Sequence, residues 1–155
     1  MGNRLLLVPG CRLVLQRDDG RVLLQLRRDL NIWGLPGGCA EPHETLGAGA
    51  ARELQEETGL VVEEPDLRAF AFSDDPSTNQ ITFPNGDMSH FFVLCFEVLR
   101  WKGTPVVNDG ESLAFDWFAP DALPEMLPSS RETVAAHQRF RQTGVFQYAL
   151  GAIRG

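Results

Sequence analysis

The sequence has few cysteines and no long apolar segment. Its three cysteines, Cys11, Cys39 and Cys95, are odd in number and widely spaced, and none forms a CxxC pair. This pattern argues against both a disulfide framework and a structural zinc site. No apolar run reaches about 18 residues, and the N-terminal stretch lacks the features of a signal peptide, so we predict a cytoplasmic protein without a membrane partner.

Basic residues are also scarce. The chain has 14 Lys and Arg against 21 Asp and Glu, and its formal net charge is −7. An acidic protein lacks the general attraction that holds proteins on phosphate backbones and anionic lipids. We therefore exclude a nucleic-acid duplex as partner and expect any phosphate to be bound locally, through a cation or a few arginines.

Repeats, blocks of like charge and low-complexity linkers are absent from the sequence as well. The 155 residues have an ordinary globular composition, 43% apolar and 23% charged. This length is enough for one compact domain with a sizeable core. We predict a single domain over residues 1–155.

The patterns that are present predict a mixture of strands and helices. The predicted elements are, in chain order, strands at 8–16 and 22–27, a loop at 28–38, a helix at 45–58, a strand at 67–73, a loop at 74–79, strands at 81–83, 89–99 and 113–118, a short helical turn within 119–128 and a helix at 129–142. Asp19-Gly20 predicts a tight hairpin between the first two strands. The order favours an α+β fold in which helices cover a mixed sheet.

Local signals set the ends of both predicted helices. Thr45 is a candidate N-cap for the first helix, and Gly59 lies where helices end. Ser129 or Ser130 is the candidate N-cap of the last helix.

Three glutamates crowd one face of the first predicted helix. Glu53, Glu56 and Glu57 are spaced i, i+3 and i+4, so their carboxylates share one patch. Like charges at this spacing destabilise an isolated helix by about 0.2–0.5 kcal/mol per pair. The patch is either a solvated surface or a site for a hard divalent cation such as Mg²⁺, which takes carboxylate oxygens and bridges to substrate phosphates.

The surrounding residues favour the metal site. The chain contains, in this spacing, Gly38–x5–Glu44–x7–Arg52-Glu53-Leu54–x–Glu56-Glu57–x–Gly59-Leu60. This segment matches every specified position of the Nudix signature, so the chain resembles the Nudix hydrolases. The resemblance implies an α/β/α sandwich and hydrolysis of a nucleoside diphosphate linked to a group X, with Mg²⁺, or Mn²⁺ in its place, as cofactor.

The resemblance also implies roles for the residues of this segment. Glu53, Glu56 and Glu57 are the expected metal ligands, helped by the backbone carbonyl of Gly38, and Glu56 is the preferred acceptor of the proton from the attacking water. Gly37 would let the backbone come close to the metal and phosphate without a Cβ.

Arg52 joins the catalytic set because it is expected to pair with Glu44 and orient the carboxylates. Glu41, three residues before Glu44, is either part of the metal shell or a solvated loop residue. Glu111, just before a predicted strand, is either a loop carboxylate that serves as ligand or base, or an ordinary turn residue.

Substrate contacts are expected outside the segment. Arg27 and Arg28 end a strand just before the glycine-rich loop, where they either meet a phosphate or are ordinary charges at a strand edge. Trp33, Phe83 and Phe91 either stack on a base or belong to the core.

The identity of the substrate is less well defined. Pro76 lies sixteen residues beyond Leu60, at a position that often marks ADP-ribose-type members, which favours a nucleotide sugar such as ADP-ribose. Hydrolysis of a (d)NTP to monophosphate and pyrophosphate is the alternative. A non-catalytic module that senses a nucleotide is a third hypothesis, and a homodimer is a further one.

Overall fold

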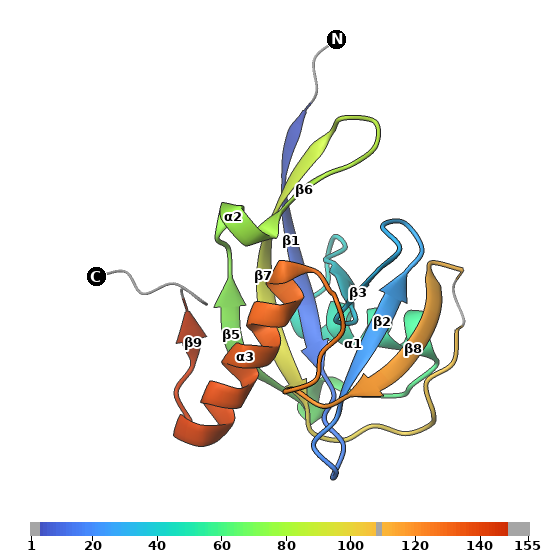
Figure 1. Ribbon diagram of the computed structural model, residues 1–155, viewed down its shortest axis with the longest axis vertical. Helices are drawn as coiled ribbons and strands as arrows, with labels where there is room; N and C mark the ends of the chain where they lie inside the picture. The colour runs from blue at the N-terminus through green and yellow to red at the C-terminus, as the bar shows by residue number, and fades with distance from the viewer. Residues whose placement is uncertain (1–3, 108–109, 149–155) are drawn as a thin grey trace.

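The computed structural model describes residues 4–107 and 110–148, which form two β-sheets and the helices around them (Figure 1). The larger sheet is mixed: β1 and β7 run parallel, whereas β5 and β6 are antiparallel to β7. Its strands are β1 (Leu5–Val14), β4 (Gly37–Cys39), β5 (Leu67–Ser73), β6 (Gln80–Thr82), β7 (Met88–Val98) and β9 (Gln147–Tyr148). They are arranged in the order β4-β1-β7-β5-β9, and β6 pairs with the start of β7.

The smaller sheet lies beside the larger one and is antiparallel. It consists of β3 (Ile32–Gly34), β2 (Val22–Arg27) and β8 (Ser112–Phe118), with β2 in the middle. In the described residues no helix is long and apolar enough to span a membrane.

Two helices cover opposite faces of the larger sheet. In Figure 1, α3 (Pro128–Thr143) lies in front of the sheet and α1 (Leu46–Thr58) lies behind it. Each helix packs on its own core cluster: Leu54 of α1 packs with Leu13, and Val134 of α3 with Val14. Adjacent strand residues face opposite sides, so β1 serves both cores. The α/β/α sandwich predicted from the sequence is confirmed.

The helix that carries the glutamates ends close to where its signals predict. Thr45 accepts a hydrogen bond from the backbone N–H of Ala48, and Gly59 closes the helix with φ 76°. Only glycine adopts this left-handed conformation without strain. These caps set the ends of α1, and the spacing of Glu53, Glu56 and Glu57 places them on neighbouring turns of it.

The predicted hairpin between the first two strands is confirmed at its tip only. A tight turn forms, with Gly20 at φ 87°, and the pairing consists of the antiparallel bridge between Gln16 and Val22 and two cross-strand hydrogen bonds, from Arg17 N to Arg21 O and from Leu23 N to Leu15 O. Beyond it the strands separate into different sheets, because each finds a longer partner elsewhere.

Three local predictions also differ from the structure. The predicted loop at 28–38 contains β3 and β4, and the predicted loop at 74–79 contains a one-turn helix, α2 (Pro76–Asn79). Residues 119–128 contain a turn closed by Ala122 N and Ala119 O instead of a helical one.

The last helix also begins earlier than predicted. It begins at Pro128, with Leu127 in the N-cap position. Proline suits the first helical position because its missing N–H would have no partner there. Ser130 is therefore inside the helix, and its hydroxyl accepts a hydrogen bond from Leu35 N instead.

Candidate active site

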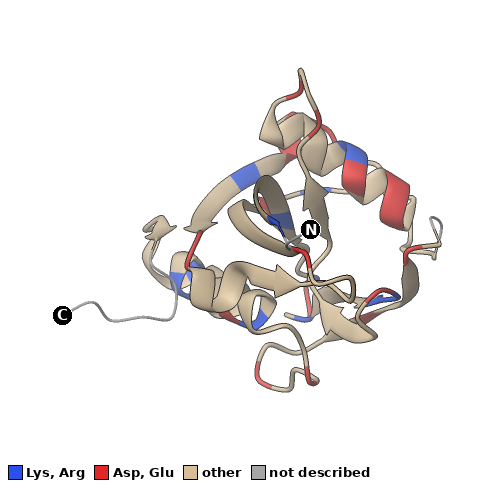
Figure 2. Cartoon of the chain, turned by 90° about the horizontal axis from the view of Figure 1, so that it is seen from above, with Lys and Arg blue, Asp and Glu red and all other residues tan. Residues whose placement is uncertain are grey.

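Arg52 is the centre of an acidic network on α1. Its guanidinium lies 2.7 Å from Glu44, 3.0 Å from Glu53, 3.2 Å from Glu56 and 3.4 Å from Glu41. The hydrogen bond to Glu44 contributes most to raising the pKa of Arg52 and to lowering the pKa of Glu44. Glu53 and Glu56 lie on α1 with Arg52, whereas Glu41 and Glu44 lie in the loop before it; Figure 2 shows a basic band beside acidic bands on one helix. Among the described residues, one cation thus serves four carboxylates.

Glu53 reaches back from α1 onto the backbone of β4. A Cβ added to Gly38 would overlap its carboxyl group, so this contact requires glycine. Burial raises the pKa of Glu53 above its usual value; Arg52 opposes this effect, while Glu56 and Glu111 add to it. Excess negative charge therefore collects at this point.

Glu57 is held more rigidly than Glu53. It is 4% exposed, and it accepts hydrogen bonds from Gln25 Nε2 at 2.7 Å and from the backbone N–H of Gly37 at 3.2 Å. Gln25 is in turn hydrogen-bonded to Ser112 on β8. The smaller sheet therefore positions this carboxylate.

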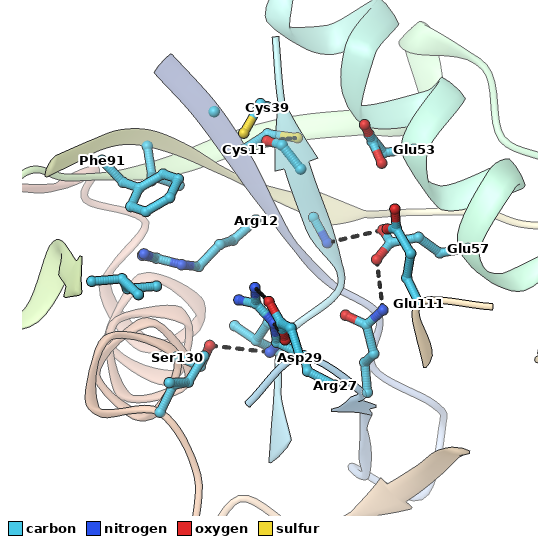
Figure 3. A pocket seen from close by; sticks show the side chains of 18 of the residues that line it. Cys11, Arg12, Arg27, Asp29, Cys39, Glu53, Glu57, Phe91, Glu111 and Ser130 are labelled. Atoms are coloured by element: carbon cyan, nitrogen blue, oxygen red, sulfur yellow. Dashed lines mark hydrogen bonds and ion pairs between the residues drawn. The ribbon is translucent and has the colours of Figure 1, made fainter. Parts of the chain in front are cut away.

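A pocket of about 620 Å³ runs from these carboxylates to an apolar end. Glu53, Glu57 and Glu111 lie together at one side, as Figure 3 shows. Phe91 lies on the opposite side in Figure 3, and the apolar side chains of Ile81, Phe83, Val93 and Leu127 also line the pocket. Gly37 and Gly38, in β4, also line the pocket. The pocket thus combines an acidic end with an apolar end that suits a flat ring.

Both predicted substrate arginines line the pocket, and each has a partner in the protein. Arg27 forms two hydrogen bonds with Asp29, at 3.0 and 2.7 Å. Arg28 donates from Nε to the carbonyl of Gly110 at 2.7 Å. Phe83 lies in the loop after β6 and is half-buried on the pocket wall.

Four predicted residues, Glu41, Glu44, Arg52 and Glu56, are not part of the pocket wall. Glu56 is 57% exposed and points to Arg52, and Glu41 is 61% exposed at the edge of the same network. Their proposed roles stay predictions.

Gln25 and Arg12 line the pocket as well, although the sequence did not predict them as site residues. Both are polar residues inside strands of mostly apolar sequence. The alternation of β1 gives a signal: Gly10, Arg12 and Val14 share one face, and a cation on a core-facing position needs a reason.

The donor set fits a divalent cation. Oxygen ligands from carboxylates and a backbone carbonyl suit Mg²⁺, and the surplus of acidic groups around Arg52 favours a further positive charge. In the described residues no three acidic, histidine or cysteine side chains already converge as a ligand shell. Instead, Glu53 and Glu56 each form an ion pair with Arg52.

Comparisons with known proteins agree with this site. The NUDIX domain family matches residues 7–138. A MutT-like protein of Streptomyces ambofaciens is 32% identical over 117 residues, which are 74% of this chain and 65% of that protein. Nucleoside triphosphatase NudI of Salmonella newport is 27% identical over 130 residues, covering 81% of this chain and 86% of that protein.

A comparison with solved structures supports the same family. The crystal structure of a MutT NUDIX hydrolase from Burkholderia pseudomallei superposes with a TM-score of 0.68 at 29% identity, covering 84% of this chain and 97% of that chain. The chain spans just under two thirds of the Streptomyces protein and 23–41% of three other curated relatives. With its NUDIX domain, fold and acidic helix, the chain belongs to the Nudix hydrolase family.

Proposed function

We propose that this protein hydrolyses the pyrophosphate linkage of a nucleoside diphosphate bound to a group X, with Mg²⁺ as the natural cofactor and Mn²⁺ as a substitute. One observation carries the proposal: a single pocket joins the carboxylates of the Nudix segment to an apolar end across the glycines of β4. Such a pocket accommodates a phosphate chain at one end and a ring at the other.

The residues of the chain divide the work between them. Glu53, Glu56, Glu57 and the carbonyl of Gly38 would hold the cation, which when bound supplies charge neutralisation for the phosphates and acidifies water. Gln25 fixes the orientation of Glu57. Arg52 keeps the carboxylates in place when no metal is bound.

The proton of the attacking water goes to a carboxylate at the acidic end. Glu56 is the predicted acceptor. Glu111, which lines the pocket, is the alternative. A Gln substitution at each position separates the two, because only the loss of the acceptor changes the pH profile of kcat.

The group X is the open part of the proposal. Pro76 favoured a nucleotide sugar such as ADP-ribose, but it is also the first residue of α2, where proline has a structural role. The name of the Salmonella relative, a nucleoside triphosphatase, supports the (d)NTP alternative. Both substrates contain the same bond.

A substrate panel tests the proposal. Release of monophosphate or pyrophosphate is measured with Mg²⁺ for nucleotide sugars and (d)NTPs, beside Glu53→Gln and the control Glu125→Gln. Glu125 is exposed and outside the pocket, so its variant loses the same charge elsewhere. We expect Glu53→Gln alone to lose about 10²–10³-fold in kcat. Nucleotide binding without turnover by the wild type would identify the sensing module instead.

Three further hypotheses accompany this proposal: a single domain over 1–155, a cytoplasmic location and a homodimer. The first two rest on composition and on the cysteines, all of which are free. Light scattering coupled to size-exclusion chromatography decides between monomer and dimer.

A further inference from the structure

Arg12 lies in the pocket on the side away from the carboxylates. It belongs to β1, opposite Gly37 of β4 and Cys95 of β7. Its terminal nitrogens donate to Asn79 of α2 at 2.5 Å and to Thr133 of α3 at 3.3 Å. Figure 3 shows its side chain extending towards Phe91 and away from Glu53. Two helices thus hold the guanidinium in one orientation.

The charge of Arg12 is not neutralised by an ion pair. Within the part of the chain that the structure describes, no carboxylate lies within 4.0 Å of it, whereas Arg27 has Asp29 and Arg52 has four glutamates. Burial lowers the pKa of Arg12, and Arg27 lowers it further, while attraction from Glu132 opposes the change. A half-buried cation without an ion pair is costly, which makes a ligand with acceptor groups favourable here.

The surroundings define what such a ligand looks like. Phe91 and Val93 belong to β7 and lie on the same side of the sheet as Arg12, and Phe83 and Ile81 line the same pocket. Gly10, which pairs with Val93, leaves this wall without a side chain. The apolar surface suits the face of a ring, and the guanidinium suits its polar edge.

Arginine can only donate hydrogen bonds. It carries five N–H groups, and Asn79 and Thr133 account for two of them in the described residues. The remaining donors require acceptors on the ligand. Guanine presents two neighbouring acceptors, O6 and N7, to a guanidinium, whereas adenine places an amino donor where guanine has O6. The two purines stack equally well, so only the atoms at this edge, O6 in guanine and the amino group in adenine, distinguish one base from the other.

We propose that Arg12 reads the nucleobase of the substrate and selects guanine over adenine. This inference rests on the proposed function, since it assigns the apolar end of the pocket to the base. It also changes the expectation for X-linked substrates, because a guanosine diphosphate sugar is preferred to ADP-ribose.

The test compares matched purines in two assays. The first assay measures kcat/KM with Mg²⁺ for GTP against ATP and for a GDP-sugar against the ADP-sugar. The second assay measures Kd for GMP and AMP by titration calorimetry, which needs no turnover. Arg12→Met keeps the length of the side chain without its donors, and Arg12→Lys keeps the charge without the two-pronged geometry. Arg27→Met is the matched control in the same pocket.

We expect Arg12→Met to lower the guanine-to-adenine ratio by about 5- to 150-fold in both assays, the range for one bidentate contact. Arg12→Lys should lower it as well, and Arg27→Met should leave it unchanged. Melting curves confirm that each variant is folded. Arg12→Lys keeps the test valid if Arg12→Met fails to fold.

Other outcomes overturn the inference. Equal losses for guanine and adenine nucleotides would mean that Arg12 binds a phosphate, and an unchanged ratio would mean that it is structural. Absence of hydrolysis by the wild type would contradict the proposed function alone, because the GMP and AMP affinities still test Arg12.

Discussion

Two clusters in this protein contain carboxylates and arginines, and they have opposite charge balance. On α1, Arg52 serves Glu41, Glu44, Glu53 and Glu56. On the other face of the sheet, Glu97 alone accepts hydrogen bonds from three side chains, those of Arg68, His137 and Arg141, at 2.7–3.0 Å.

The pKa values of Glu53 and Glu97 shift in opposite directions, in line with the charge balance of their clusters. Burial raises the pKa of Glu53, and Arg52 does not fully offset it. Burial also acts on Glu97, but the hydrogen bonds from His137, Arg141 and Arg68 outweigh it and lower its pKa to about 2. A carboxylate with surplus donors stabilises the fold, whereas surplus carboxylates around one donor have room for a cation.

The first way to break this comparison is to remove the Arg52 guanidinium from the acidic cluster. Arg52→Met should lower kcat/KM by about 10- to 100-fold, because Glu53 and Glu56 lose the group that orients them. Arg52→Lys should recover only part, since lysine cannot make the same set of directed hydrogen bonds. Steady-state kinetics and the apparent Kd for Mg²⁺ measure this. Unchanged values for both would contradict the orienting role.

The reverse experiment removes the carboxylate of the second cluster. Glu97→Gln should lower the free energy of unfolding by about 2–3 kcal/mol, somewhat below the loss for a fully buried pair because Arg68 and Arg141 are half exposed. Urea denaturation gives the value. Turnover at temperatures where the variant is folded should be unaffected, and a loss of activity there would show that the clusters are coupled.

The pH dependence of that loss has a defined sign. The lowered pKa of Glu97 stabilises the protein above the unfolded value of about 4.5, and this contribution disappears as the pH falls towards about 2. The difference between wild type and Glu97→Gln should therefore shrink across this range in urea titrations. A constant difference from pH 5 to pH 2 would assign the effect to packing.

Metal binding sharpens the comparison at a smaller scale. Mg²⁺ at ten times its Kd should stabilise the wild type by about 1.4 kcal/mol, which raises Tm by about 3–6 °C in a chain of this size. The increase should be lost in Glu53→Gln and kept in Glu97→Gln, whatever its starting Tm. Differential scanning fluorimetry reports all three. The same rise in Glu53→Gln would place the metal elsewhere.

The smallest effect is expected for Glu53→Gln without metal. A raised pKa means that ionised Glu53 opposes folding once the pH exceeds the unfolded value, so the variant should match or exceed the wild type at pH 7, within about 0.5 kcal/mol. Below the unfolded pKa value Glu53 is protonated, so its charge no longer distinguishes the stability of the wild type from that of the variant. Chelator-treated protein at pH 7 and pH 4 shows the trend, and a large loss at pH 7 would contradict it.

Much of this site follows from local sequence. Thr45 and Gly59 set the ends of α1, and the spacing of Glu53, Glu56 and Glu57 then fixes their shared face. These signals act within a few residues, so no knowledge of the remaining fold is needed.

Other features depend on distant partners. The Asp19-Gly20 turn is compatible with both a hairpin and two diverging strands, and only the long parallel pairing of β1 with β7 decides between them. Likewise, the sequence shows Arg12 only as a polar residue within an apolar strand. Its partners Asn79 and Thr133 are distant in sequence and become its neighbours only in the folded protein.

The three residues of β4 have one more consequence. Through its ladder with β1, this strand joins the acidic end of the pocket to the end where Arg12 lies. A Cβ on Gly37 or Gly38 would collide with Cys11 or Glu53, so the spacing between the two ends tolerates almost no mutation, whereas a substitution at position 12 would change the groups at one end alone. Under the proposed function, natural variation or directed evolution at position 12 would therefore alter which nucleotide is accepted while the bond that is cut stays the same.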